Sequence, residues 1–377
     1  MNQLGSSIVF ALFGTGILLS SCGNPERADH PVLAVSLEET PSSIFDFFDK
    51  VEVIPIATKH ENLFSYVDNI KVYNDTIYLF DRALDAVYLF APDGSYIRRI
   101  RKVGRGYGEY LMASDFTVDP TTRTIRILNP MGEILDYDFS GIFLGKIRLP
   151  RQPKNYRLIE VLDSAHYVTW SSIYEKDKDG VNVFDATSNE IVQGYFPYST
   201  LWSSLRYGSV FNRYRDTTYY HESFSKKVYS LTSDGCRIAY EWAMDVPLDE
   251  WKPQIPIEET PAAQQRLFEQ FRNGRIPFFF GPQLQSQRYC YTVLTFSDPV
   301  VRKSLFYDKI TKESWLFSKT KEGISLDLKY MDDRYALGVL CYADREHYKG
   351  IVSEQDAILL DMMQEDDNVW LIRFYNR

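Results

Sequence analysis

The sequence predicts an all-β fold in which one four-stranded antiparallel unit is repeated around a ring. Three hairpins carry a turn glycine at positions 94, 141 and 235, so the steps between them are 47 residues and twice 47 residues. The skipped position is Ser188-Asn189, which is itself a turn-forming pair. A fixed period of about 40–50 residues built from strand–turn–strand units is typical of a β-propeller. Tyr and Phe, with 27 and 24 copies, also favour strands.

Equivalent positions of the four hairpins are apolar, which indicates a common structure. Four residues before the turn position stand Phe90, Tyr137, Phe184 and Leu231. Three residues after it stand Ile97, Leu144, Ile191 and Ile238.

The first two units each divide into four short strands separated by turn residues. Unit one covers about 66–101, with strands expected at Asn69–Val72, Thr76–Phe80, Val87–Phe90 and Tyr96–Ile100. Unit two covers about 113–149, with strands expected at Phe116–Asp119, Thr124–Leu128, Ile134–Phe139 and Phe143–Leu149. Four strands are what one propeller blade needs.

The period continues through units three (about 156–196) and four (about 205–245) and is then interrupted. The next hairpin, Ser304–Phe317, turns at Thr311-Lys312, 76 residues beyond Gly235 instead of 47. About 29 residues are therefore inserted, and we place the insertion at 247–287. It contains one convincing helix, with Thr260 as N-cap and Pro261 at the first helical position.

The sixth unit runs from about Ile324 to the end of the chain and is one regular strand short. Its expected strands are Tyr335–Tyr342, Ala357–Met363 and Val369–Tyr375. We predict that Val51–Ala57 supplies the missing strand from the other end of the chain. A ring closed by strands from both ends has no free edge. The predicted fold is a six-bladed β-propeller with one short helical insertion.

The first residues resemble a bacterial lipoprotein signal. An apolar run, Ile8–Leu19, has the length of a signal-peptide core and is followed by Ser20-Ser21-Cys22, which resembles a lipobox. One departure is that Met1–Ser21 contains no Lys or Arg. We expect a signal peptide at 1–21, lipidation of Cys22, a tether at 22–35 and the propeller at 36–377. Such a protein would be anchored in the cell envelope, at the outer membrane, on the periplasmic or the surface-exposed side.

A glycine-rich link, Gly104–Tyr110 (GRGYGEY), follows the first unit. It resembles the G-x-G-x-G-E-[YF] link of the six-bladed, NHL-like β-propeller lipoproteins of Bacteroidetes-type bacteria. The lipobox, the segment Val87–Ile100 and the C-terminal strand Val369–Tyr375 carry the same resemblance, which covers about 36–377. It implies fold and location. Most members have no assigned activity, and many accompany carbohydrate-uptake systems.

The net charge of −9 argues against a nucleic-acid partner and against adsorption to an anionic membrane surface. We expect a monomeric propeller that meets the membrane only through its N-terminal lipid. The five histidines show no metal-ligand spacing, and no nucleophile motif is present. We therefore expect no catalytic residues, no metal and no cofactor.

Aromatic side chains are the better indication of function, because flat rings with a polar edge suit sugars and protein surfaces. The candidate binding residues are Tyr198, Trp202, Tyr207, Trp251 and Phe279, with Arg105 and Tyr107 of the glycine-rich link. The alternative is that these aromatics wedge between blades as core and that the link is only a crossover between blades. Three functions remain open: binding of a glycan or partner protein through one face, a carbohydrate hydrolase or lyase with convergent carboxylates in the central channel, or a structural subunit of an envelope complex.

Overall fold

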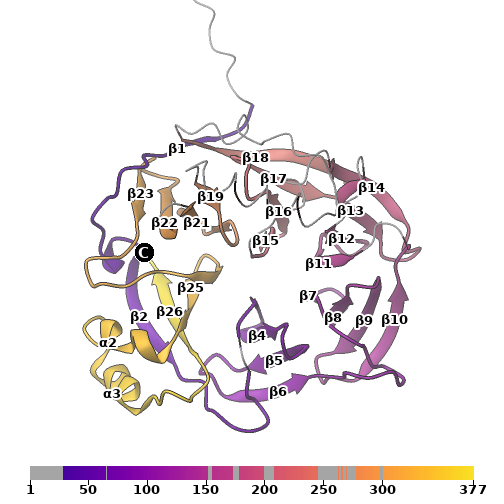
Figure 1. Ribbon diagram of the computed structural model, residues 1–377, viewed down its shortest axis with the longest axis horizontal. Helices are drawn as coiled ribbons and strands as arrows, with labels where there is room; N and C mark the ends of the chain where they lie inside the picture. The colour runs from indigo at the N-terminus through magenta and orange to yellow at the C-terminus, as the bar shows by residue number, and fades with distance from the viewer. Residues whose placement is uncertain are drawn as a thin grey trace, which may run out of the picture.

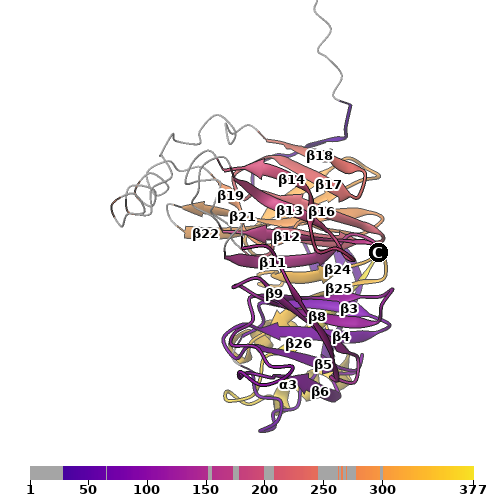
Figure 2. The same ribbon diagram turned by 90° about the vertical axis from the view of Figure 1, so that its right-hand side faces the viewer.

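Six sheets surround a central axis as the blades of a propeller, seen along the axis in Figure 1 and from the side in Figure 2. This computed structural model describes residues 29–64, 66–151, 155–172, 178–198, 208–244, 277–297 and 300–377, together with Ala262, Gln265 and Glu269. The predicted six-bladed propeller of antiparallel sheets is confirmed. Among the described residues, no helix has the length and apolar character needed to cross a membrane.

The first three blades are regular meanders that run from the channel outward. Blade 1 contains β3 (Asn69–Tyr73), β4 (Thr76–Asp81), β5 (Ala86–Phe90) and β6 (Tyr96–Ile100). Blade 2 contains β7 (Asp115–Asp119), β8 (Thr124–Asn129), β9 (Glu133–Asp138) and β10 (Phe143–Arg148). Blade 3 contains β11 (Tyr156–Val161), β12 (His166–Ser171), β13 (Asp179–Asp185) and β14 (Ile191–Pro197).

The other three blades carry additions to this plan. Blade 4 contains β15 (Phe211–Tyr214), β16 (Thr217–His221), β17 (Lys227–Thr232), β18 (Gly235–Ala243) and the added β1 (Val32–Ala34). Blade 5 contains β19 (Phe278–Phe279), β20 (Leu284–Gln285), β21 (Tyr289–Ser297), β22 (Val300–Asp308) and β23 (Ser314–Phe317). Blade 6 contains β24 (Leu328–Met331), β25 (Tyr335–Leu340), β26 (Trp370–Asn376) and β2 (Phe48–Ile54).

Blade 6 closes the ring with strands from both ends of the chain, as predicted. Strand β2 pairs antiparallel with β26, with Val53 opposite Ile372. Its apolar side chains join the largest buried cluster, which spans blades 1, 5 and 6. The closing strand begins three residues earlier than the expected Val51.

One expected strand of blade 6 is a helix. Residues predicted as a strand at Ala357–Met363 lie in α3 (Glu354–Met362). Ser353 caps this helix, because its hydroxyl accepts the backbone N–H of Asp356. The cap outweighs the short apolar run, of which only Leu360 is buried within the helix. Strand β24 takes the missing place in the sheet.

The segment before β2 is a strap along the outside of the ring rather than a free tether. Strand β1, inside the predicted tether 22–35, pairs in parallel with β18 of blade 4. Leu33 is buried there beside Trp242. The backbone N–H of Thr40 then donates to Leu316 in β23 of blade 5. The strap therefore joins blades 4, 5 and 6 in order.

The described C-terminal part of the predicted insertion, residues 277–287, is not an addition to the propeller. It forms β19 and β20, which together make the split inner strand of blade 5. The two aromatics of β19 are buried against their own sheet and blade 4. Ala262, Gln265 and Glu269 are helical, in agreement with the expected helix; the rest of 247–276 lies outside the described residues.

The 47-residue step marks the turn between the third and fourth strands of blades 1 to 4, and the same turn recurs after a longer interval in blade 5. Left-handed backbone at this turn is found at Gly94, Gly141, Asn189, Gly235 and Lys312. The apolar position four residues before the turn position is buried in every case: Phe90, Tyr137, Phe184 and Leu231. The repeat thus reflects one turn conformation shared by blades 1 to 5 and one buried apolar position shared by blades 1 to 4.

Gly94 and Gly141 allow a matched test of these turns. Both have a left-handed φ, of +85° and +78°, so alanine at either is expected to cost about 1–2 kcal/mol of unfolding free energy. A Cβ at Gly94 would lie 2.2 Å from the Pro55 carbonyl oxygen, whereas at Gly141 the nearest atom is 3.5 Å away. Gly94→Ala should therefore lose clearly more stability than Gly141→Ala in urea unfolding. If both variants lose the same unfolding free energy, the backbone at Pro55 moves aside for the new methyl group without a measurable energetic cost.

Candidate functional site

The central channel of the propeller contains a cavity of about 860 Å³. Residues of the inner strands or the segments beside them line it in all six blades, for example Lys71 in β3, Glu160 in β11 and Lys329 in β24. Its lining includes partly exposed rings of Tyr66, Tyr73, Tyr214, Phe280 and Tyr330. The cavity is thus a concave site with both charged and aromatic walls.

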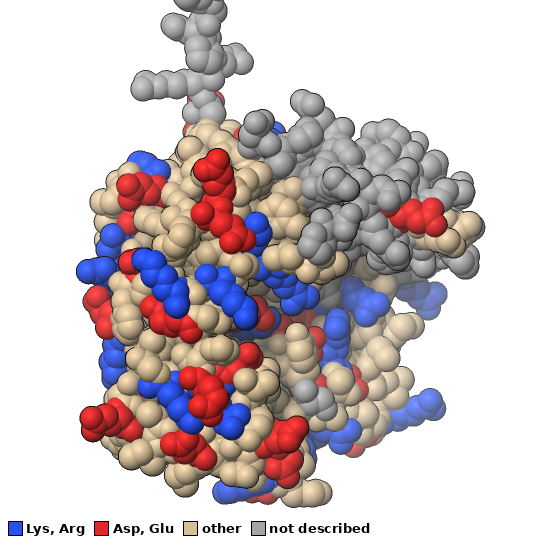
Figure 3. All heavy atoms as spheres, turned by 60° about the vertical axis from the view of Figure 1, so that its left-hand side comes forward, with Lys and Arg blue, Asp and Glu red and all other residues tan. Residues whose placement is uncertain are grey.

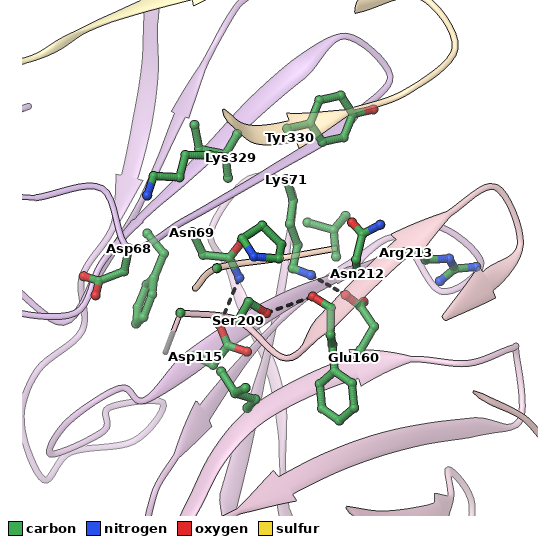
Figure 4. Close-up of a pocket in the computed structure, with 18 of the residues that line it drawn as sticks. Asp68, Asn69, Lys71, Asp115, Glu160, Ser209, Asn212, Arg213, Lys329 and Tyr330 are labelled. Carbon is green, nitrogen blue, oxygen red and sulfur yellow. Dashed lines mark hydrogen bonds and ion pairs between the residues drawn. The ribbon is translucent and has the colours of Figure 1, made fainter. Parts of the chain in front are cut away.

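An ion pair crosses the middle of this channel. The ammonium of Lys71 in blade 1 lies 2.5 Å from the carboxylate of Glu160 in blade 3 (Figure 4). The other carboxylate oxygen of Glu160 accepts from the Thr117 hydroxyl at 2.6 Å, and from the backbone N–H of Val161. Burial opposes ionisation of Glu160, but Lys71, the Thr117 hydroxyl and the positive charge of Arg213 outweigh it and lower its pKa. Three blades are therefore joined through one ionised carboxylate.

A second buried carboxylate lies next to it along the channel. Asp115 in β7 accepts from the Asn69 amide at 3.2 Å and from the Ile159 backbone N–H at 3.1 Å (Figure 4). Burial raises the pKa of Asp115 to about 6, although Lys71 and the neutral donors act in the opposite direction. Asp115 and Glu160 are therefore neighbours with opposite pKa shifts, because Lys71 contacts only Glu160 directly.

The raised pKa of Asp115 gives a pH-dependent prediction. Between pH 3.8 and about 6 the folded protein holds a proton that the unfolded chain releases, so acidification through this window favours folding. Asp115→Asn abolishes that response. The stability of the variant relative to the parent should be about 2–3 kcal/mol more favourable at pH 7.5 than at pH 4, measured by urea unfolding. If the difference in unfolding free energy between Asp115→Asn and the parent is the same at both pH values, the pKa of Asp115 is not raised.

Two predicted binding residues belong to the core instead of a binding surface. Tyr198 is buried, and its hydroxyl donates to the Ser171 carbonyl. Phe279 is buried in β19, with its ring centroid 6.2 Å from that of Trp242. Both follow the alternative considered from the sequence, since a propeller needs large rings where adjacent blades meet. Trp202, Tyr207, Trp251 and the lipidation candidate Cys22 lie outside the described residues.

The glycine-rich link crosses from blade 1 to blade 2 and is built for close packing. A Cβ on Gly104 would lie 2.0 Å from the Glu109 carboxylate, which accepts the Gly106 N–H at 2.7 Å. Arg105 is exposed, and Tyr107 is 91% exposed with its ring edge-on to Phe143. A groove of about 230 Å³ separates the link from blade 2. Neither Arg105 nor Tyr107 lines the central cavity.

The channel residues were missed because their partners are far apart in sequence; Lys71 and Glu160 are separated by 89 positions. A signal was nevertheless present. Lys71 stands between Ile70 and Val72, and Glu160 between Ile159 and Val161. A charged residue inside the apolar first strand of a repeating unit indicates a side chain directed at the central axis, where charges from several blades can meet.

Two solved structures of similar fold come from Bacteroides species. A putative exported protein of Bacteroides fragilis has a TM-score of 0.77 at 16% identity, covering 92% of this chain and 99% of that one. A Bacteroides vulgatus member of the DUF4221 family has a TM-score of 0.56 at 8% identity, covering 87% of this chain and 97% of that one. At these identities the likeness shows the fold alone. The comparison with curated proteins finds no match. A family model matches residues 32–374, and the chain belongs to that family, the domain of unknown function DUF4934.

Proposed function

We propose that this protein is a non-enzymatic, lipid-anchored propeller of the cell envelope that binds a glycan in its central channel. The observation that carries the proposal is the cavity of about 860 Å³ on which all six blades converge. That volume is in the range of small-molecule sites, which reach about 1,000 Å³.

The walls of the cavity have the chemistry of a sugar site. Tyr66, Tyr73, Tyr214, Phe280 and Tyr330 present partly exposed rings, on which the apolar faces of sugar rings can stack. Charged and amide side chains between them supply hydrogen-bonding groups for hydroxyls. The proposal keeps the expectation that aromatic side chains bind the ligand, but the rings that line the cavity are not the ones that the sequence singled out.

The two buried carboxylates favour binding over hydrolysis. A glycosidase needs one carboxyl group directed at the leaving oxygen and a second at the sugar or at a water. The oxygens of Asp115 and Glu160 instead accept hydrogen bonds from Asn69, Thr117 and Lys71 and from backbone N–H groups. These contacts hold blades 1, 2 and 3 together, which explains the carboxylates without a reaction.

Lipid anchoring is supported by the lipobox-like Leu19–Cys22 and by the position of β1, which begins ten residues after Cys22 on the outside of blade 4. The exported Bacteroides fragilis neighbour fits the same location. In an expressing bacterium, labelled palmitate should enter the parent protein and be lost from Cys22→Ser. Labelling that persists in the variant would refute the anchor.

The binding proposal is tested with a glycan array on the full chain in detergent, followed by calorimetry with each glycan that binds. Tyr66→Ala and Phe280→Ala should each weaken binding about tenfold, since each removes a stacking ring from the cavity. Tyr107→Ala is the matched control, because it removes an exposed ring outside the cavity. An array with no binding, or binding lost only in the control, would overturn the proposal; a protein captured in place of a glycan would favour the partner-binding alternative.

A further inference from the structure

We infer that the channel selects an anionic oligosaccharide, held at two arginines near opposite ends of the cavity, Arg157 and Arg213. This inference rests on the proposed glycan binding and names its ligand class.

Most basic groups in the cavity wall are neutralised by the protein itself. Lys71 pairs with Glu160 at 2.5 Å, Arg82 with Asp68 at 3.3 Å, Lys329 with Asp327 at 2.9 Å, and Arg215 with Asp333 at 2.7 Å. Arg157 and Arg213 differ, because no described carboxylate lies within 4 Å of either guanidinium and both line the cavity. Their charge is therefore available to a ligand.

The carboxylates in the middle of the channel offset this charge only in part. Glu160 is in direct contact with Lys71 and interacts more weakly with Arg213. Asp115 accepts hydrogen bonds from neutral donors and lies near Lys71. Asp216, an exposed lining residue two positions beyond Tyr214 in the β15–β16 turn, is the remaining acidic group without a described ion-pair partner near Arg213. On the outer face shown in Figure 3, acidic and basic side chains are interspersed, so the available positive charge belongs to the cavity and does not extend over that face.

The two arginines lie at different depths of the channel. Each blade begins with its inner strand, so the inner strands run in the same direction along the axis. Arg157 is near the start of β11, whereas Arg213 in β15 donates to the carbonyl of Val161, the last residue of β11, at 3.4 Å. Four strand residues separate 157 from 161, which corresponds to about 13 Å. That separation requires an elongated ligand with more than one anionic group.

Arg213 has donor capacity left for such a ligand. Its contacts with the carbonyls of Val161 and Arg215 are both 3.4 Å long, near the limit of a hydrogen bond, and use Nη1 and Nε. A guanidinium offers five N–H donors in a fork that matches carboxylate and sulfate oxygens. Aromatic rings line the cavity at both levels: Tyr66 and Phe280 near the start of the inner strands, and Tyr214 and Tyr330 near their ends. Sugar rings between two charged groups would meet these walls.

The test measures the binding of three oligosaccharides of equal length to the full chain by calorimetry. Oligogalacturonate carries carboxylates, and a chondroitin sulfate oligosaccharide carries both carboxylates and sulfates. A xylo-oligosaccharide is the neutral probe. We expect an anionic probe to bind at least tenfold more tightly than the neutral one. Arg157→Gln and Arg213→Gln should each weaken that binding about tenfold, and the double variant should lose the preference for charge. Asp216→Asn should strengthen it severalfold, since it removes a like charge.

The matched control is Arg148→Gln, which changes an exposed arginine of the outer strand β10 and should leave binding unchanged. Preference for the carboxylated over the sulfated probe identifies the anionic group. Equal affinity for the neutral probe, or arginine variants that bind as the parent does, would overturn this inference and leave glycan binding in place. No binding of any probe, together with a negative glycan array, would overturn both proposals.

Discussion

Replacing Phe47 by alanine is expected to lower the free energy of unfolding by about 3–5 kcal/mol, the usual cost of truncating a buried phenylalanine. Phe47 directly precedes the closing strand β2 and has no exposed surface. Its ring stacks on Phe306 of blade 5 at 4.1 Å and contacts Tyr289, Trp315 and Phe317 of the same blade. Truncation leaves a cavity where blade 5 meets the closure of the ring, so both are weakened.

The measurement is urea unfolding followed by tryptophan fluorescence. Phe45→Ala serves as control, because Phe45 is two positions away and 41% exposed, and it should cost about 0.5 kcal/mol or less. Phe47→Leu should fall between the two, since it retains part of the buried volume. If Phe47→Ala and Phe45→Ala lose equal stability, the ring of Phe47 does not hold the closure.

Lys71→Met should cost about 3–5 kcal/mol, because it leaves Glu160 buried and charged with no contacting cation. The cost comes from the orphaned carboxylate rather than from the lost pair itself. Lys71→Met combined with Glu160→Gln should therefore recover most of the lost stability, even though it removes both charges. The readout is a double-mutant cycle in urea at pH 7.5.

The control for this cycle is Lys146→Met, which breaks the pair with Glu133 on the outer strands of blade 2, where both groups are partly exposed. Its expected cost is below about 1 kcal/mol. A double variant as unstable as Lys71→Met alone would show that the ammonium stabilises the channel through something other than Glu160.

The sequence was most informative where a short turn repeats. The hairpin turns, four of which follow a buried apolar position, located five blades, because the third and fourth strands of blades 1 to 5 are joined by the same left-handed turn conformation. Blade 6 was less regular. Its apolar stretch at Ala357–Met363 fits a strand or a helix equally well, and the cap supplied by Ser353 decided for the helix.

The site could not be predicted to the same degree. Lys71, Asp115 and Glu160 come from three blades, and only the packing of these blades around the axis brings them together. The aromatic content of the sequence favoured Tyr198 and Phe279 as binding residues, yet both side chains are buried in the core. The same residue types, Tyr and Phe, occur at the junctions between blades and in binding sites, so the sequence does not distinguish the two. What distinguishes them is position relative to the axis, which periodicity alone does not give.

The strap before β2, residues 31–47, has a mechanical consequence. Tension on the N-terminal end first meets the backbone hydrogen bonds between β1 and blade 4, where Glu241 donates to Pro31 at 3.0 Å and Val35 donates to Ala243 at 2.9 Å. The bond from Thr40 to blade 5, at 2.8 Å, comes next along the chain. The bonds that join Ser42 to Lys321 and Ile44 to Glu322 follow, and only after all of these are broken does the load reach β2. A pull from an anchored end would thus be absorbed at the outer edge of blade 4, and the strand that closes the ring would stay unloaded.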